Sequence, residues 1–180
     1  MKARIILLSE HQQTDIFVKK FLTISGFKMN EIRSRVSPKG KGSGEQWVRE
    51  QYPKELNESR KQSSALVVVT DADKKTVKQR IDSLDNTCVD GIDRRKPNEP
   101  VAMIIPKRNI ETWFAYLRED ELVNEENEYP KYGKKPDKCF ADAQALKEMC
   151  NKKSLRKPTP PSLEAACKEY EKLSKFKNQK

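Results

Sequence analysis

Residues 65–73 read ALVVVTDAD, and this stretch decides the fold. Its first five residues are apolar with no polar residue between them, which is typical of a strand buried on both faces of a sheet. The run ends at Asp71 and Asp73, two residues that are unfavourable in a buried strand. The sequence therefore predicts a central strand of a parallel sheet, with two carboxylates at its carboxyl end.

Other apolar runs, separated by segments with helical spacing, lie on both sides of this strand. In chain order the predicted elements are a strand over 4–9, a helix over 12–25, a strand over 27–37, a helix over 45–60, a helix from about 77, a strand over 100–106 and a helix from about 109. Alternation of strands and helices favours an α/β fold in which helices cover both faces of a mostly parallel sheet.

Residues 119–180 differ in composition from the α/β region, residues 1–118. An acidic stretch and a stretch rich in proline and lysine come first, and two amphipathic helices are predicted over 137–151 and 161–175. From residue 151 onward there are nine Lys or Arg and three Glu, so more than half of the net charge lies there. We expect a basic helical extension, joined by a linker, that holds a polyanion or docks a protein partner.

The whole chain has 180 residues, with 37 Lys and Arg against 27 Asp and Glu, and a net charge of +10. No apolar run approaches the roughly 20 residues that span a bilayer, so no membrane partner is expected. An excess of positive charge favours a polyanionic partner, most commonly nucleic acid. The alternative is that these lysines only keep a small domain in solution.

Four cysteines and one histidine limit the metal chemistry. Cys88, Cys139, Cys150 and Cys167 lack the spacing of a zinc site. The N-terminal residues show no cleavable signal pattern, so we expect reduced thiols in a cytoplasmic protein. Because His11 is the only histidine, a histidine-based metal cage is excluded, and any metal is expected to bind carboxylates.

Acidic residues follow three of the predicted strands. Glu10 follows the first, Asp71 and Asp73 follow the central one, and Glu111 opens the helix after the last. The carboxyl ends of parallel strands form one edge of a sheet, where ligands bind in such folds. Two carboxylates about 4 Å apart repel by roughly 4 kcal/mol at an effective dielectric constant near 20. A cation offsets that cost, and oxygen ligands favour Mg²⁺ or Mn²⁺.

Each of these carboxylates also has a purely structural interpretation. Asp71 or Asp73 is a suitable cap for the helix that follows. Glu10 and Glu111 are suitable first-turn residues, because negative charge is favourable at a helix N-terminus. The joint pattern, in which three strand ends deliver acids to one sheet edge, is what favours a site.

Three segments carry a resemblance to a known family. They are IILLSE at 5–10, VVVTDAD at 67–73 and IIPKRNIETW at 104–113. Together they resemble the Toprim-like core of OLD-family nucleases, topoisomerases and primases, and most of all the small uncharacterised Toprim-like proteins of bacteria and phages. The resemblance covers roughly residues 3–117, and it implies a Toprim/Rossmann-like sheet.

The resemblance also implies roles for the four acids. Asp71 and Asp73 would bind Mg²⁺, and Glu10 would be a metal ligand or the general base. Glu111 would be a further ligand or would orient one. The implied function is a Mg²⁺-dependent phosphotransferase, most simply a nuclease acting on DNA or RNA, in a host-defence or mobile-element system.

Basic and aromatic residues are the candidates for contact with nucleic acid. The resemblance places Lys107 and Arg108 where they would neutralise a phosphate, with ordinary surface solvation as the alternative. The glycine-rich loop 39–44, which contains Lys41, precedes a helix and offers backbone N–H groups to a phosphate, or is only a flexible connection. Trp113 shares the helical face of its apolar neighbours and is expected in the core rather than stacked on a base.

Three departures from the family pattern favour a second function. His11 stands where the family usually has glycine, Thr14 where it often has an acid, and Lys74 where glycine is common. The alternative is therefore a catalytically degenerate Toprim-like module that binds nucleic acid or a protein.

Overall fold

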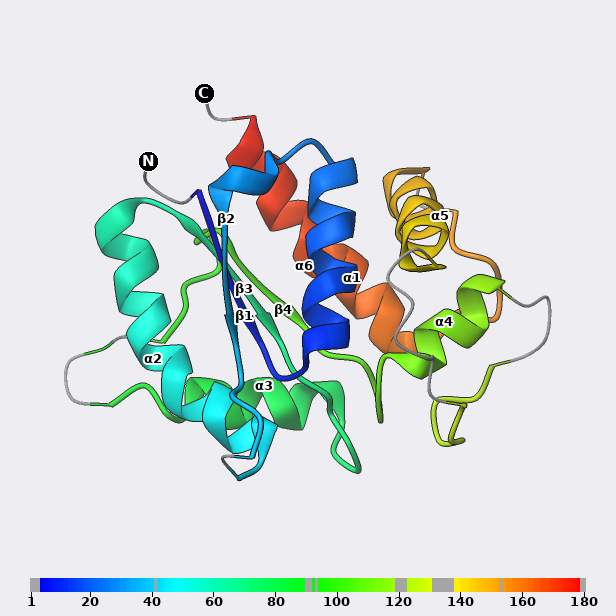
Figure 1. The fold of residues 1–180 in the computed structure, drawn as a ribbon, viewed down its shortest axis with the longest axis horizontal. Helices are drawn as coiled ribbons and strands as arrows, with labels where there is room; N and C mark the ends of the chain where they lie inside the picture. The colour runs from blue at the N-terminus through cyan, green and yellow to red at the C-terminus, as the bar shows by residue number, and fades with distance from the viewer. Residues whose placement is uncertain are drawn as a thin grey trace.

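The protein's structure, a computed structural model, describes residues 4–40, 42–89, 92, 94–118, 123–130, 138–152 and 154–178. Figure 1 shows the elements in the described residues, in chain order: β1 (Ile5–Ser9), α1 (Gln12–Ile24), η1 (Met29–Glu31, a 3-10 helix), β2 (Ile32–Val36), α2 (Gly44–Gln62), β3 (Ala65–Val69), α3 (Val77–Asp85), β4 (Val101–Ile104), α4 (Glu111–Arg118), α5 (Lys138–Lys152) and α6 (Pro161–Lys177).

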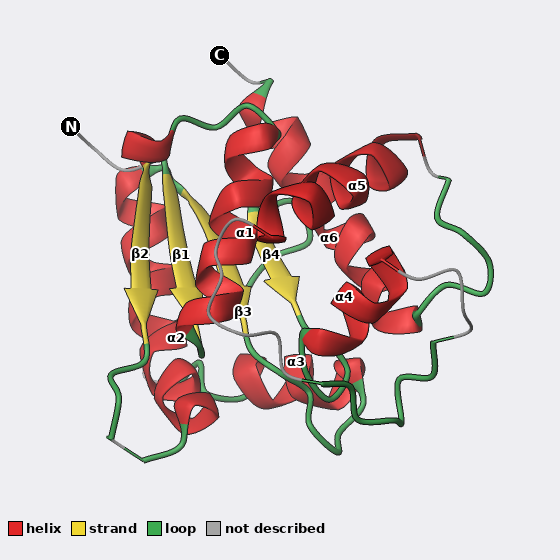
Figure 2. Cartoon of the chain, turned by 45° about the vertical axis from the view of Figure 1, so that its right-hand side comes forward, coloured by secondary structure: helices red, strands yellow, loops and turns green. Residues whose placement is uncertain are grey.

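The four-stranded sheet is parallel throughout, in the order β2-β1-β3-β4, and Figure 2 shows the arrows of β2, β1 and β4 running in one direction. β1 and β3 occupy the two central positions, and every residue of both strands has 0% exposure. The predicted α/β class, with a parallel sheet and helices on both faces, is confirmed. Its physical cause is that a central parallel strand has no solvent face and stays apolar along its length.

Successive side chains of the central strands point to opposite faces. Ile5, Leu7 and Val67 belong to one hydrophobic cluster with α1, α4, α5 and α6. Ile6 and Leu8 belong to the other, with α2 and α3. In Figure 1 α2 accordingly lies on one side of the sheet, with α1 and α6 on the other.

Two element boundaries differ from the prediction for local backbone reasons. The second strand was expected from residue 27, but residues 29–31 turn as η1 and the strand begins at Ile32. The last helix of the α/β region begins at Glu111 rather than near 109. The backbone oxygen of Ile110 accepts from the N–H groups of Trp113 and Phe114, so the helical hydrogen bonds begin there, and Arg108, with a φ of 59°, lies outside the helix.

The two C-terminal helices belong to the same core as the sheet. Leu146 of α5, with Leu163 and Leu173 of α6, joins the hydrophobic cluster on the α1 face. α6 also covers the edge strand β4, where the Glu169 carboxylate accepts a hydrogen bond from the backbone N–H of Met103 at 3.0 Å. Covering an edge strand removes unpaired backbone groups that would otherwise be open to other chains.

Part of the basic charge of this segment serves the fold. Lys147 Nζ donates to the backbone oxygen of Ile24 at 2.7 Å, and Lys177 Nζ donates to that of Ser25 at 2.8 Å. These are the carbonyl groups left free at the end of α1, where positive charge is favourable. The net charge of the segment therefore overstates the charge that it offers to a partner.

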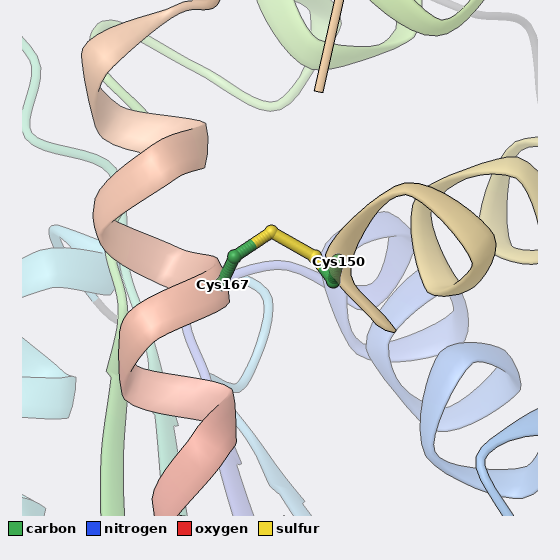
Figure 3. The surroundings of a disulfide bond; sticks show 2 residues. All are labelled: Cys150 and Cys167. Atoms are coloured by element: carbon green, nitrogen blue, oxygen red, sulfur yellow. A yellow bond between two sulfur atoms is a disulfide. The ribbon is translucent and has the colours of Figure 1, made fainter. Parts of the chain in front are cut away.

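A disulfide joins Cys150 of α5 to Cys167 of α6, with their Cα atoms 5.5 Å apart (Figure 3). The prediction of reduced thiols is wrong for this pair, because the packing of the two helices, not the spacing along the chain, brings the sulfurs together. Cys88 and Cys139 are free thiols. Among the described residues, none of the helices has the length and apolar character needed to cross a membrane.

Candidate metal centre

The site is built at the carboxyl ends of β1 and β3. These strands are adjacent, with Ser9 opposite Val69, so Glu10 and Asp71 emerge at the same sheet edge. The Glu10 carboxylate accepts hydrogen bonds at Oε2 from the Thr70 hydroxyl, at 2.6 Å, and from the backbone N–H of Asp71, at 3.0 Å. Both acids are buried, with 8% and 7% exposure. The predicted convergence of these two residues is therefore present, and one oxygen of Glu10 is held in place.

His11 joins the two carboxylates, although no sequence pattern indicated it. Its Nε2 lies 3.4 Å from Glu10 Oε1 and 3.9 Å from Asp71 Oδ2, and its side chain is 56% exposed. One ligand atom from each of the three residues lies within 4.8 Å of the others. An imidazole therefore lies beside the predicted carboxylates and could join them as a donor. The single histidine had ruled out a cage of several imidazoles, but not one imidazole beside two acids.

Negative charge gathers around Asp71. Burial is the largest cause that raises the pKa of Asp71 well above its usual value. Three neighbouring carboxylates raise it further, those of Glu10, Asp73 and Glu111, while Arg80 acts in the opposite direction. Glu111, buried in the first turn of α4, therefore lies within electrostatic reach of the site. This concentration of like charge is the condition under which a bound cation is stabilising.

Asp73, which is predicted to bind the metal together with Asp71, lies apart from the other donor groups. Its φ is 52°, its side chain is 62% exposed, and its carboxylate lies 3.1 Å from a guanidinium nitrogen of Arg80. It is not one of the three groups that lie within 4.8 Å of one another among the described residues. In this conformation Asp73 adds charge near Asp71 but does not join the donor group, and its role as a ligand stays a prediction.

Arg80 is a second residue near the site that was not predicted. Its side chain is 3% exposed, and it lies in α3, pairing with Glu45 in the first turn of α2. It also donates to the backbone oxygen of Ala72 at 3.4 Å, in addition to its pair with Asp73. Arg80 therefore ties the turn after β3 to the start of α2. No pattern in the sequence distinguishes this arginine from the other basic residues of a polar helix.

The basic residues predicted to bind phosphate are engaged with the protein itself. Lys107 Nζ donates to the backbone oxygen of Lys75 at 3.1 Å and lies 3.3 Å from a carboxylate oxygen of Glu126. Arg108 pairs with Glu128 at 2.7 Å. The two glutamate side chains are exposed, whereas those of Lys107 and Arg108 are only 12% and 28% exposed, so these pairs partly cover the cations. Lys41 lies outside the described residues. The phosphate-binding roles of all three stay predictions.

Gly44, at the end of the glycine-rich loop, lies directly against Glu10. A Cβ atom at this position would lie 2.7 Å from Glu10 Cγ and 3.3 Å from Glu10 Oε1. Gly44 is the first residue of α2, which is capped by the Ser43 hydroxyl accepting from the Gln46 N–H at 3.5 Å. The absence of a side chain thus allows the helix to begin against the buried carboxylate.

We expect Gly44→Ala to weaken divalent-metal binding about tenfold, a loss typical of disturbing a group that supports a ligand. The added methyl group would displace Glu10, while alanine suits a helix better than glycine. Isothermal titration with Mn²⁺ measures the effect. Gly40→Ala is the control, because that loop position has a positive φ but a Cβ atom added there would meet nothing within 4 Å. Equal Mn²⁺ affinity in the two variants would show that Gly44 does not shape the site.

Comparison of the chain with protein-family models, curated proteins and solved structures finds no match. The donor atoms of the site therefore indicate which metal ions it suits. Carboxylate oxygens suit Mg²⁺ and Mn²⁺, and an imidazole nitrogen adds affinity for Mn²⁺ and later transition metals over Mg²⁺. The residues present fit a divalent cation, with Mn²⁺ fitting the full set of three.

Proposed function

We propose that this protein is a Toprim-like, metal-dependent phosphotransferase, most simply a nuclease acting on DNA or RNA with Mn²⁺ or Mg²⁺. The observation that carries the proposal is the pairing of Glu10 and Asp71, two buried carboxylates from adjacent central strands. Buried carboxylates that face each other destabilise the fold unless a proton or a cation offsets the charge. A cation held by these carboxylates beside a phosphodiester would be suited to promote its hydrolysis.

The protein's own residues supply position and charge. Glu10, His11 and Asp71 would hold the ion, which when bound polarises a phosphate and makes water more acidic. Thr70 and the Asp71 N–H fix one oxygen of Glu10, so its other oxygen, Oε1, faces His11 and is available to a ligand. Glu111 adds negative charge close to Asp71 that strengthens the attraction for a cation.

Substrate recognition would rest on cations near this edge. Lys107 and Arg108 follow β4, the strand next to β3, and their partners Glu126 and Glu128 have side chains 70% and 81% exposed. A polyanionic backbone would replace these two carboxylates as the partner of the basic side chains. The proposed mechanism therefore predicts that substrate binding displaces the acidic segment around residues 126–128.

A binding module without catalysis is the second candidate. The observation that favours it is the ion pair between Asp73 and Arg80, which holds one expected ligand away from the donor group. Such a module would bind nucleic acid without a metal and with strong salt dependence. On duplex DNA the slope of log K against log salt is about −0.9 for each phosphate contacted.

The deciding experiment is a Mn²⁺ titration combined with cleavage of labelled DNA and RNA. We expect wild type to cleave at least one of them only with metal, and Glu10→Gln to lose about 100-fold or more in rate. Glu50→Gln is the matched control, because Glu50 is exposed on α2 and bonds only to Gln46 among the described residues. Metal-dependent cleavage that survives Glu10→Gln would contradict the proposed function. Metal-independent, salt-sensitive binding without any product would favour the binding module.

A further inference from the structure

A cleft of about 220 Å³ opens beside the disulfide, at a place distinct from the proposed metal centre. Cys150 and Cys167 both line it, and neither cysteine is fully buried. Met149 and Leu155 give it an apolar part. Its volume exceeds that of a single water several times, so the cleft has room for part of a small molecule. The two linked sulfurs are therefore in contact with a space that a reactant can enter.

The charged residues of the cleft carry both signs. They are Lys157, Lys168, Glu164 and Glu171. Lys157 Nζ lies 3.8 Å from Glu164 and Lys168 Nζ lies 3.6 Å from it, and both lysine side chains are about three-quarters exposed. Exposed pairs at such distances contribute little, so a ligand with its own charges can replace them. A molecule with carboxylates and an ammonium group complements this lining better than an anion or a cation alone.

We propose that this cleft is a thiol–disulfide exchange site for a small zwitterionic peptide thiol of the glutathione class. The apolar part would accept the thiol-bearing portion, and the charged walls would hold the carboxylates and the ammonium group. Accessible disulfides are the ones that exchange readily, whereas buried structural ones resist reduction. The inference does not depend on the metal centre or on the proposed function.

The exchange proceeds in two steps that balance in atoms and electrons. The peptide thiolate attacks Sγ of Cys150, a mixed disulfide forms there, and Cys167 leaves as a thiolate. A second peptide thiolate attacks the sulfur of the bound peptide, which releases the oxidised peptide disulfide and the Cys150 thiolate. Two electrons pass from two peptide thiols to the protein, and both cysteine thiolates take protons from water.

The positions of the two cysteines in their helices set the direction of attack. Cys150 lies in the last turn of α5, which ends at Lys152, and Cys167 lies in the middle of α6. A thiolate is disfavoured at a helix C-terminus, where the helix dipole is negative. Cys167 is therefore the better leaving group, and Cys150 is the sulfur that carries the mixed disulfide.

Reduction removes the covalent link between two differently anchored helices. α5 packs on α1 and α4, whereas α6 packs along β4. The bond closes a loop with a sequence separation of 17 residues. Opening this loop increases the conformational freedom of the unfolded chain. Reduced protein is therefore expected to unfold at a lower temperature than oxidised protein.

The first test places the full-length chain in mixtures of reduced and oxidised glutathione and counts free thiols by alkylation and intact mass. We expect the Cys150–Cys167 pair to pass from mostly oxidised to mostly reduced within the range of these mixtures, with a matching fall in the thermal midpoint. Cys88→Ser is the control and should behave like wild type. A folded protein whose pair resists a large excess of reduced glutathione overturns the proposal, and so does a pair that never oxidises.

The second test compares the reactivity of the two sulfurs and asks whether the lysines of the cleft recognise glutathione. With oxidised glutathione, Cys150→Ser should gain one glutathionyl group on Cys167 faster than Cys167→Ser gains one on Cys150, because the Cys150 thiolate is disfavoured at the end of α5. Adding Lys157→Gln and Lys168→Gln to Cys167→Ser should slow that reaction about tenfold, but leave the rate with neutral 2-hydroxyethyl disulfide unchanged. Lys78→Gln, on the exposed face of α3, is the charge-matched control. If the lysine substitutions slow the reactions with oxidised glutathione and with 2-hydroxyethyl disulfide equally, the cleft does not recognise glutathione. The same conclusion follows if they do not slow the reaction with oxidised glutathione.

Discussion

Asp71→Asn is expected to abolish metal-dependent activity and to raise the free energy of unfolding of the metal-free protein by about 1 kcal/mol. The substitution keeps the shape of the side chain and removes a buried carboxyl group whose ionisation is opposed by burial and by the charges of Glu10 and Glu111. The backbone N–H of residue 71, which donates to Glu10, is unaffected. Urea unfolding with and without Mn²⁺ measures the change. Wild type should gain stability from Mn²⁺, and the variant should gain little.

The pH dependence of the same variant gives a separate check. Because the pKa of Asp71 is raised in the folded protein, protonation of this group favours folding. Its stabilising contribution is fully present below the usual pKa of an aspartate. It is lost as the pH rises through the higher pKa of the folded state. Metal-free Asp71→Asn should lack this decline.

Asp82→Asn is the matched control for both measurements, since Asp82 is exposed and pairs with Lys78 on the surface of α3. It should change stability by less than about 0.5 kcal/mol, as surface substitutions usually do. A loss of stability in metal-free Asp71→Asn would contradict the proposal that repulsion between Asp71 and the neighbouring carboxylates destabilises the metal-free fold. The carboxylate of Asp71 would then have a structural role.

Trp113→Ala is expected to reduce the free energy of unfolding by about 3–5 kcal/mol, the usual cost of truncating a large buried aromatic residue. Trp113 is 1% exposed, and its indole N–H donates to the Ser162 hydroxyl at 2.8 Å. The side chain therefore fills the core on the α1 face and joins α4 to α6. Chemical unfolding followed by circular dichroism measures the loss.

Two comparisons distinguish a packing role of Trp113 in the core from a role in stacking on a nucleic-acid base. Trp113→Phe keeps most of the buried ring and removes the hydrogen bond to Ser162, so a smaller loss of about 1–2 kcal/mol is expected. Trp47→Ala is the second comparison, because Trp47 is only partly buried and should cost less than Trp113→Ala. If Trp113→Phe lowers nucleic-acid affinity while leaving stability unchanged, Trp113 stacks on a base and the core assignment is wrong.

The central strands were predictable because their signal is local. Residues 5–8 and 65–69 are continuous apolar runs, and all of them are fully buried in two adjacent parallel strands. The convergence of Glu10 and Asp71 followed from the same signal, since parallel strands end at one edge of the sheet. Glu111 was placed near them by the same argument, and its charge reaches Asp71.

The direction of individual side chains was not predictable in the same way. Asp71 and Asp73 are two residues apart and were expected to act together. A left-handed backbone at Asp73 and the buried Arg80 turn the second carboxylate away from the donor group. His11 was interpreted as a departure from a family pattern, yet its imidazole lies beside both buried acids. These outcomes depend on side-chain torsions and on partners distant in sequence.

The amino-acid sequence by itself determined which segments form the sheet and which acids stand at its edge, because burial on both faces requires apolar residues along a whole strand. Only the tertiary structure decided what the C-terminal helices do. Their packing against α1 and β4 links Cys150 to Cys167 and directs Lys147 and Lys177 to the end of α1. These contacts join residues far apart in the chain, and the spacing within one segment carries no information about how two segments meet in space.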